Sequence, residues 1–308
     1  MNVVTKWVGM RDRKSDDMTA EIIKRNVLVL GCNGMLGNAA FRLLSTSSDF
    51  TTWGTVRAAA RLQKLRDSLH THIVSGVDVH DQDAMVTLLQ NTKPDIVINC
   101  IGLVKQLADA TDPLAALPTN SLLPHRLARL CALVGARLVH VSTDCVFTGK
   151  KGGYTEQDVP DARDLYGISK CLGEVDYPNA ITLRTSIIGH ELNSAHGLIG
   201  WFLAQQGTVK GFTKAVFSGL PTVSLAKVIR DHVLPNPQLR GVYHVSAAPI
   251  DKYDLLFRVA KAYGKSIDIV PDATLVIDRS LDSTRFKNAT GYVPPSWDEL
   301  IREMREFG

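Results

Sequence analysis

One short segment constrains the fold of this chain more than any other: an apolar run that leads directly into evenly spaced glycines. Residues 26–30 read Asn-Val-Leu-Val-Leu, and Gly31, Gly34 and Gly37 follow at intervals of three. The apolar run suits a strand buried on both faces, and residues 38–44 have a helical pattern. A strand, a glycine-rich turn and a helix in this order are typical of a doubly wound α/β fold that binds a dinucleotide.

The glycines of this turn have separate physical roles. Gly31 permits the tight turn, Gly34 lets backbone approach a pyrophosphate, and Gly37 lets the helix pack close to the strand. The amino end of the helix adds N–H groups and a positive dipole that favour phosphate. A glycine-rich turn without a ligand is the alternative. We expect cofactor contacts from Gly31, Asn33, Gly34, Met35, Leu36 and Gly37.

The alternation of strands and helices continues along the chain and predicts the fold class, a doubly wound parallel sheet. Further strands are expected at 50–56, 73–77, 95–99, 137–142, 180–185 and 241–245. Helices are expected at 58–69, 81–90, 121–134, 198–205, 224–233, 252–263 and 296–305.

The domain organisation follows from where this alternation becomes looser, after residue 186. We expect a dinucleotide-binding Rossmann domain at 25–185, joined by a returning strand at 241–246. Residues 186–240 and 247–308 are expected to form a smaller C-terminal substrate-binding lobe, and residues 1–24 a flexible extension. Ligands of such folds bind outside the carboxyl ends of the strands, so we expect the site in the cleft between the two parts.

Composition excludes several other classes. The net charge of +4 includes no long basic block, which argues against a nucleic-acid partner. No stretch approaches the roughly 20 apolar residues that span a bilayer, and the first two dozen residues lack an apolar signal core, so we expect no membrane association. The five cysteines are scattered without metal-binding spacing, which indicates reduced thiols, a cytoplasmic location and no metal site.

The end of the second expected strand bears on the choice of cofactor. Arg57 stands where an acidic residue would bond the ribose hydroxyls of NAD, and a basic residue favours the 2′-phosphate of NADP. We therefore expect NADP(H) in preference to NAD(H), although Arg57 at the start of a solvated helix is the alternative. Asp78 suits the adenine amino group or a turn. Val79, Cys100, Ile101 and Gly102, which follow the third and fourth strands, are further expected cofactor contacts. Tyr166 and Lys170 complete this set, with the lysine expected at the nicotinamide ribose.

Tyr166-Gly-Ile-Ser-Lys170 is the one YxxxK sequence in the chain. On a helix, residues four apart share a face, so the phenol and the ammonium point into the same space. The lysine charge should lower the pKa of the phenol from about 10 toward the working pH. Tyr166 would then transfer a proton to a carbonyl oxygen as a hydride reaches the carbon. Thr143, with Ser142 beside it, is expected to bond the same oxygen from the end of the fifth strand.

These segments together resemble the dTDP-4-dehydrorhamnose reductases, a group of extended short-chain dehydrogenases. The resemblance rests on the glycine turn, the Val139–Phe147 segment, the YxxxK sequence and Leu183-Arg-Thr-Ser186, and it runs from about residue 26 to the C-terminus. It implies NADPH-dependent reduction of a 4-keto-6-deoxy sugar carried on a nucleotide diphosphate. The catalytic set would be Thr143, Tyr166 and Lys170. The expected substrate contacts are Lys105, Thr143, Asp144, Cys145, Trp201 and Arg279, with Arg184 a further candidate for the diphosphate.

Cys145 departs from the pattern of that group, which commonly has tyrosine at this position. Sugar-nucleotide dehydratases carry glutamate here, so dehydration is not expected. GDP-fucose synthases carry a cysteine two residues after the catalytic hydroxyl and a later histidine, which Cys145 and His196 match in rough spacing. A bifunctional epimerase and reductase is therefore an alternative, against the usual role of a free cysteine as a small buried hydrophobe.

Binding without turnover is the other alternative. The sequence also resembles the methionine adenosyltransferase regulatory subunit, which uses this fold to bind a dinucleotide and a partner. A third possible class of protein is a redox sensor whose conformation depends on whether NADP(H) is bound. The presence of Thr143, Tyr166 and Lys170 favours an enzyme, because a protein that only binds has no chemical need for all of them. A homodimer is expected by analogy with the fold class alone.

Overall fold

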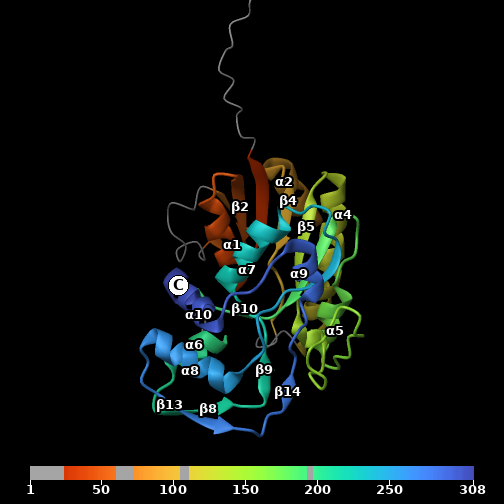
Figure 1. The fold of residues 1–308 in the computed structure, drawn as a ribbon. Helices are drawn as coiled ribbons and strands as arrows, with labels where there is room; N and C mark the ends of the chain where they lie inside the picture. The colour runs from red at the N-terminus through yellow and green to blue at the C-terminus, as the bar shows by residue number, and fades with distance from the viewer. Residues whose placement is uncertain (1–23, 60–71, 105–110, 193–196) are drawn as a thin grey trace, which may run out of the picture.

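A seven-stranded sheet, parallel at every pairing, forms the centre of the computed structural model, which describes residues 24–59, 72–104, 111–192 and 197–308 (Figure 1). The strand order is β3–β2–β1–β4–β5–β6–β11. The strands are β1 (Arg25–Leu30), β2 (Phe50–Val56), β3 (Ile73–Ser75), β4 (Ile96–Asn99), β5 (Arg137–Thr143), β6 (Ala180–Thr185) and β11 (Gly241–His244). Each was predicted from the sequence, with ends that differ by two residues or fewer.

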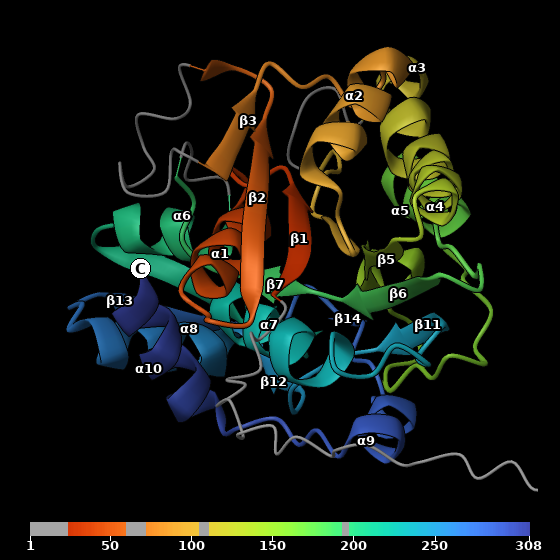
Figure 2. The same cartoon turned by 90° about the horizontal axis from the view of Figure 1, so that it is seen from above.

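Helices cover both faces of this sheet (Figure 2). Successive side chains of β1 enter opposite cores, which explains why the strand reads as a continuous apolar run. Val27 and Val29 pack in the core that includes α1 (Met35–Ser45), whereas Leu28 and Leu30 pack in the core beneath α2 and α4. These two helices are α2 (Gln82–Thr92) and α4 (Leu123–Leu133).

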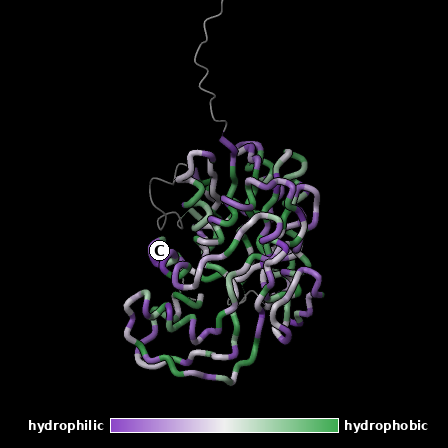
Figure 3. The backbone as a smooth tube through the Cα atoms, in the orientation of Figure 1, coloured by the Kyte–Doolittle hydropathy of each residue, from purple (hydrophilic) through white to green (hydrophobic). Residues whose placement is uncertain are grey.

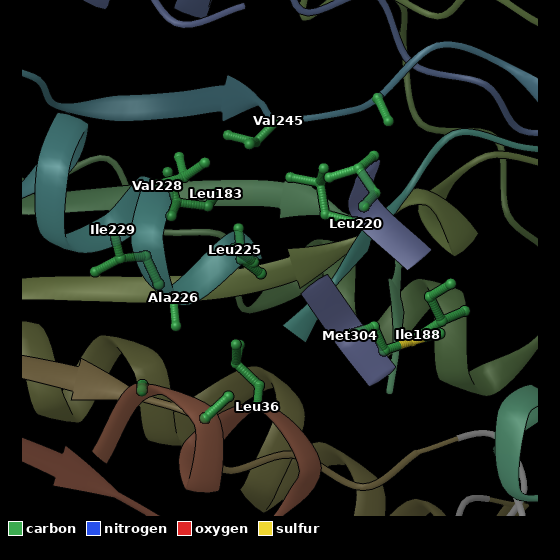
Figure 4. Close-up of a cluster of buried hydrophobic side chains, with 14 of the residues drawn as sticks. Leu36, Leu183, Ile188, Leu220, Leu225, Ala226, Val228, Ile229, Val245 and Met304 are labelled. Atoms are coloured by element: carbon green, nitrogen blue, oxygen red, sulfur yellow. The ribbon is translucent and has the colours of Figure 1, made fainter. Parts of the chain in front are cut away.

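The core on the α1 side is completed by chain segments from the second half of the sequence. Figure 4 shows Leu225 and Ala226 of α7 (Thr222–Val228) between the main sheet and Leu36 of α1, with Met304 nearby. Met304 belongs to α10 (Trp297–Phe307), which begins with a capping box made by Ser296 and Glu299. Part of the segment 186–240 therefore packs on the sheet of the nucleotide-binding half.

The other segments from the second half of the sequence lie beyond one end of the sheet. Figure 3 shows that apolar and polar stretches alternate along them. Helices α6 (Leu198–Ala204) and α8 (Lys252–Tyr263) pack here with short strands. The strands are β8 (Thr208–Phe212), β9 (Ala215–Phe217), β12 (Ile250–Asp251), β13 (Asp268–Asp272) and β14 (Ile277–Asp278), while β7 (Ile187–Ile188) pairs with β10 (Leu220–Pro221). The sequence did not predict these strands.

Several helix boundaries differ from the prediction. The helix expected at 121–134 is preceded by α3 (Pro113–Ala116) and a π-helical turn, η4 (Leu117–Leu122), and the one expected at 224–233 ends in a second π-helical turn, η6 (Ile229–Val233). Asp81 caps α2 as predicted, and its carboxylate accepts a 3.0 Å bond from the Ala84 N–H. The helix expected at 58–69 lies almost entirely outside the described residues. No described helix has the length and apolar character of a membrane span.

The order of the strands locates the ligand site. From β1 the chain moves outward to β2 and β3, and from β4 it moves outward in the other direction to β5, β6 and β11. The connections diverge between β1 and β4, and in open α/β sheets ligands bind outside the carboxyl ends of the strands at such a point. The glycine turn that starts at Gly31 follows β1, and Cys100 follows β4, so both expected cofactor segments lie at this point.

Candidate active site and cofactor-binding loop

The glycine turn has the backbone geometry that its sequence predicts. Gly31 has φ +79°, a conformation that side chains other than glycine rarely adopt. A Cβ at Gly37 would lie 2.1 Å from the Gly31 carbonyl oxygen, so the close approach of α1 to the turn requires glycine. A Cβ at Gly34 would meet only that oxygen, at 3.4 Å, and would otherwise point into open space. The turn is thus closed on the protein side and open where a pyrophosphate would approach.

Thr55 holds this turn from the neighbouring strand, a role that the sequence did not indicate. The Gly31 N–H donates to Thr55 Oγ1 at 3.1 Å, and the Cys32 N–H donates to the Thr55 carbonyl at 3.0 Å. Thr55 is buried. A threonine before the end of β2 therefore fixes the start of the loop to the sheet.

The remaining cofactor candidates lie around the same point of the sheet. Arg57 follows β2 directly and is exposed, and Val79 is half-buried. Asp78 accepts a 2.9 Å bond from the His80 N–H, which is the turn that the sequence left open as its alternative role. Ile101 stands against the turn, because a Cβ at Gly31 would lie 2.9 Å from its Cγ1.

Asn120 joins the loop after β4 to the catalytic helix. Its Oδ1 accepts from the Leu103 N–H at 2.9 Å, and its Nδ2 donates to the Leu103 carbonyl and to Ser169 Oγ, each at 3.2 Å. Asn120 lies in η4 and is buried. A Cβ at Gly102 in the same loop would lie 3.8 Å from Lys170 Nζ, so the cofactor loop and the catalytic lysine are neighbours. No sequence signal that we used pointed to Asn120.

Tyr166 and Lys170 lie one turn apart on α5 (Leu165–Leu172), as predicted. Asp164 caps this helix by accepting from the Gly167 N–H at 2.9 Å. A Cβ at Gly167 would lie 2.4 Å from the Cys145 carbonyl oxygen, so glycine lets α5 approach the end of β5. The Thr143 hydroxyl lies close enough to the Tyr166 phenol to lower its pKa. The structure thus brings the expected catalytic hydroxyls together.

The Lys170 ammonium is buried and donates a 2.8 Å hydrogen bond to the Val141 carbonyl. Burial lowers the pKa of Lys170 to about 8, while negative charge at Glu174 and Cys100 raises it. The ammonium is therefore retained at neutral pH but titrates just above it.

The expected lowering of the Tyr166 pKa by Lys170 is wrong. Burial of the phenol oxygen raises the pKa of Tyr166 above its usual value, and the charges of Cys145 and Asp144 raise it further, while the Thr143 hydroxyl lowers it. Desolvation of a phenolate outweighs the favourable contact. Tyr166 is consequently protonated at neutral pH, which suits a proton donor.

The suggestion that Arg184 binds a diphosphate is also wrong. Arg184 is buried and forms a two-point ion pair with Glu174, from Nε at 2.8 Å and from Nη2 at 2.5 Å. Its Nη1 lies 2.9 Å from His244 Nε2, so this nitrogen must accept and the imidazole proton is on Nδ1, facing the Tyr154 carbonyl at 2.9 Å. The guanidinium is occupied within the protein.

Asp144, Cys145 and Arg279 form the other side of the catalytic hydroxyls. Thr143 Oγ1 lies 3.2 Å from Asp144 Oδ1 and accepts from the Cys145 N–H at 3.1 Å. Arg279 donates from Nε to the Phe147 carbonyl at 2.8 Å and from Nη1 to Cys145 Sγ at 3.7 Å. Burial raises the pKa of Asp144, and it raises the pKa of Cys145 to about 11. The Cys145 thiol therefore favours its protonated form at neutral pH.

Three further candidates fall elsewhere. Trp201 lies on α6 in the smaller lobe and is 39% exposed. Lys105 and His196 lie outside the described residues. Among the described residues, no group of three or more His, Cys, Asp or Glu side chains is arranged to hold a metal ion.

Comparison with known proteins places the chain in a family. The RmlD substrate binding domain family matches residues 25–306. Methionine adenosyltransferase 2 subunit beta of Danio rerio is 28% identical over 300 residues, 86% of this chain and 88% of that protein. The probable low-salt glycan biosynthesis reductase Agl14 of Haloferax volcanii is 26% identical over 264 residues, 82% of this chain and 85% of its own length.

A solved structure agrees with this assignment at the level of the fold. The dTDP-4-dehydrorhamnose reductase of Bacillus anthracis, crystallised in complex with NADP, has a TM-score of 0.74 at 20% identity, over 93% of this chain and 100% of that one. The expected doubly wound parallel sheet of the Rossmann type is confirmed. The chain belongs to the RmlD substrate binding domain family.

Proposed function

We propose that this protein uses NADPH to reduce the 4-keto group of a 4-keto-6-deoxy sugar carried on a nucleotide diphosphate. The observation that carries the proposal is the convergence of Thr143, Tyr166 and Lys170 beside the glycine turn, because a carbonyl reductase needs a proton donor and a hydroxyl contact next to its cofactor. Agl14, a probable glycan biosynthesis reductase, supports a sugar-nucleotide substrate.

The glycine turn fits a dinucleotide. We assign its pyrophosphate to the backbone from Gly31 to Gly37 at the amino end of α1, whose N-cap Gly34 has no side chain to occupy the position. The adenosine 2′-phosphate is assigned to Arg57, which is exposed at the end of β2. When bound, NADPH supplies the hydride that adds to the carbonyl carbon of the sugar.

The chain supplies the proton. Tyr166 is protonated at neutral pH and donates its phenolic proton to the carbonyl oxygen, which becomes the alcohol of the product. The Thr143 hydroxyl, beside the phenol, donates to the same carbonyl oxygen and fixes its position. Lys170 lies one turn further along α5 with its ammonium retained at neutral pH, and the phenolate left on Tyr166 takes up a proton from solvent.

Cofactor binding and substrate binding are assigned to different parts of the chain. We assign cofactor binding to residues 25–185 with the returning strand at 241–246, and substrate binding to 186–240 and 247–308. Arg279 supports this division, because it reaches from the later segment to the loop after β5.

The bifunctional alternative receives no support from Cys145. A cysteine that exchanges protons at carbon needs a lowered pKa, whereas burial and the neighbouring Asp144 raise the pKa of Cys145 to about 11. Its expected partner, His196, is outside the described residues.

The second candidate function is an NADP-binding regulatory subunit, favoured by the 28% identity to methionine adenosyltransferase 2 subunit beta. A direct test is NADPH oxidation, followed by absorbance, with enzymatically prepared dTDP-, UDP- and GDP-linked 4-keto-6-deoxy sugars. Turnover with any of them, and a 6-deoxy sugar nucleotide as product, supports the reductase. Saturable NADPH binding without oxidation of any member of the panel favours the regulatory subunit.

A further inference from the structure

A cavity beside Arg279 is not explained by the catalytic groups. It has a volume of about 430 Å³, within the range of small-molecule sites. Its lining consists of Phe147, Thr148, Lys150, Ala162, Arg163, Asp164 and Arg279. Three of these side chains are cations, and they come from segments far apart in the sequence.

The cavity is linked to the catalytic hydroxyls by a continuous series of contacts. Tyr166 lies beside Thr143, and Thr143 Oγ1 accepts from the Cys145 N–H at 3.1 Å. Cys145 Sγ lies 3.7 Å from Arg279 Nη1, which lines the cavity. A ligand with its reactive end at Tyr166 would therefore have Arg279 beside it, one residue away from the reacting groups.

Arg279 is held in place before any ligand binds. Its Nε donates to the Phe147 carbonyl at 2.8 Å, and the Phe147 ring is fully buried and stacked on Tyr154 at 4.1 Å between centroids. A Cβ at Gly149 would lie 3.0 Å from Arg279 Cγ, so a glycine makes room for the arginine stem. A guanidinium held in this way loses little freedom when it binds an anion.

Cations outnumber carboxylates in the lining, where Asp164 is the one acidic residue beside Lys150, Arg163 and Arg279. Asp164 caps α5, and Asp161 accepts from the Thr148 N–H at 2.7 Å and from Thr148 Oγ1 at 2.6 Å. Asp144 is buried, and burial raises its pKa, while the Arg279 charge lowers it. The side chains of Lys150 and Arg163 are exposed, which leaves positive charge facing the cavity.

We propose that this cavity binds the diphosphate group of the substrate, with Arg163 and Lys150 as contacts in addition to Arg279. Guanidinium groups bind phosphate oxygens in pairs, and ammonium groups add a point charge. The keto sugar then extends from the diphosphate, past Cys145, to Thr143 and Tyr166. The inference rests on the proposed function for the identity of the sugar, but the recognition of a diphosphate is tested without turnover.

The test is calorimetric titration of the full chain with dTDP and UDP in the presence of saturating NADPH. The NADPH occupies the glycine turn, so that a diphosphate cannot bind there. Thymidine and uridine, which lack phosphate, are the matched ligands, and Arg163→Met, Lys150→Met and the control Lys287→Met are the variants. Arg163 and Lys150 are exposed, so their replacement leaves the fold intact.

We expect dTDP or UDP to bind at least about tenfold more tightly than its nucleoside, and Arg163→Met to weaken that binding about tenfold. Lys150→Met should have a smaller effect, Lys287→Met none, and added NaCl should weaken binding of the diphosphates only. Equal affinities in the wild type, Arg163→Met and the double variant Lys150→Met/Arg163→Met would overturn the inference, as would a lack of binding by both diphosphates.

Failure of the proposed function is distinguishable from failure of this inference. Charge-dependent diphosphate binding without oxidation of any keto sugar would leave the site assigned and reject the reductase. Turnover of a sugar nucleotide with the same KM in the wild type and the double variant would support the reductase and reject this site.

Discussion

Ser142 Oγ donates a 2.8 Å hydrogen bond to Glu174 Oε1, which joins the end of β5 to the chain just after α5. Glu174 is at the same time the partner of the buried Arg184. The carboxylate therefore connects the strand that carries Thr143 with the strand that carries Arg184. This connection places a buried negative charge close to Lys170, whose pKa it raises.

The Ser142–Glu174 bond is one of three contacts between the same two segments. Three successive residues at the end of β5 interact with three residues spaced by four along α5 and its continuation, two of them through hydrogen bonds. Four is the spacing that places side chains on one helix face. The pairs are Val141 with Lys170, Ser142 with Glu174, and Thr143 with Tyr166. The catalytic hydroxyls are thus positioned by the same set of contacts that buries the ammonium.

The first prediction concerns Glu174→Gln. Since burial lowers the pKa of Lys170 to about 8 and the Glu174 charge opposes this effect, wild-type kcat/KM should fall as the pH rises through about 8. Removal of the carboxylate charge should lower the pKa of Lys170 further and move this decline to lower pH. The pH profile measures the shift, with the exposed Glu306→Gln as control. An unchanged profile would show that Glu174 has only a structural role.

Arg184→Met tests the buried ion pair through stability. The partners are only 4% and 9% exposed, so loss of the guanidinium leaves a buried carboxylate without its main partner. We expect the free energy of unfolding to fall by about 3–5 kcal/mol. Glu174→Gln in the same chain removes that unpaired charge and should restore part of the loss. Urea denaturation of the single and double variants measures both effects, and strictly additive losses would contradict the account.

Gly34→Ala and Gly37→Ala form a matched pair in the glycine turn. At Gly37 a Cβ would overlap the Gly31 carbonyl, so we expect lower stability, by about 1–3 kcal/mol, and weaker NADPH binding. At Gly34 a Cβ would meet the same oxygen at an ordinary 3.4 Å, so stability should change little while NADPH binding weakens. Fluorescence titration and thermal unfolding separate the two effects. Unimpaired NADPH binding by Gly34→Ala would exclude this turn as the pyrophosphate site.

Arg57→Ser tests the choice of cofactor. Arg57 is exposed at the end of β2, so stability should be unchanged. Loss of a charge-assisted contact to the 2′-phosphate should raise the Kd for NADPH about tenfold or more and leave the Kd for NADH nearly the same. Titration with both cofactors gives the ratio. An equal effect on the two would mean that Arg57 does not distinguish them.

The main sheet was predictable because its signals are local. Val27 to Leu30 are buried on both faces, and such a strand appears in sequence as an unbroken apolar run. The strands of the smaller lobe, such as β12 and β14, have only two residues each, so their pairing depends on distant partners rather than on a pattern. The periodicity of apolar residues therefore cannot predict how these short strands pair.

The catalytic residues were predictable for the same reason. The prediction failed where the partners of a side chain are set by tertiary structure. Tyr166 and Lys170 share a helix face that their spacing fixes. From the sequence, Arg184 is a reasonable phosphate ligand. The structure pairs it with Glu174, ten residues earlier, and the sequence pattern did not indicate this pairing. Asn120 bonds Leu103 and Ser169 from a π-helical turn, which no residue pattern marks.

Tyr166→Phe tests the central claim most directly, because it removes the proton donor and keeps the ring. In the sugar-nucleotide assay with the wild type as reference, we predict that kcat falls by a factor of about 100 or more. The Kd for NADPH should change little, since the pyrophosphate is assigned to the turn from Gly31 to Gly37 and not to the phenol. A variant that binds NADPH normally and reduces the keto sugar at the wild-type rate would contradict the assignment of Tyr166 as the acid.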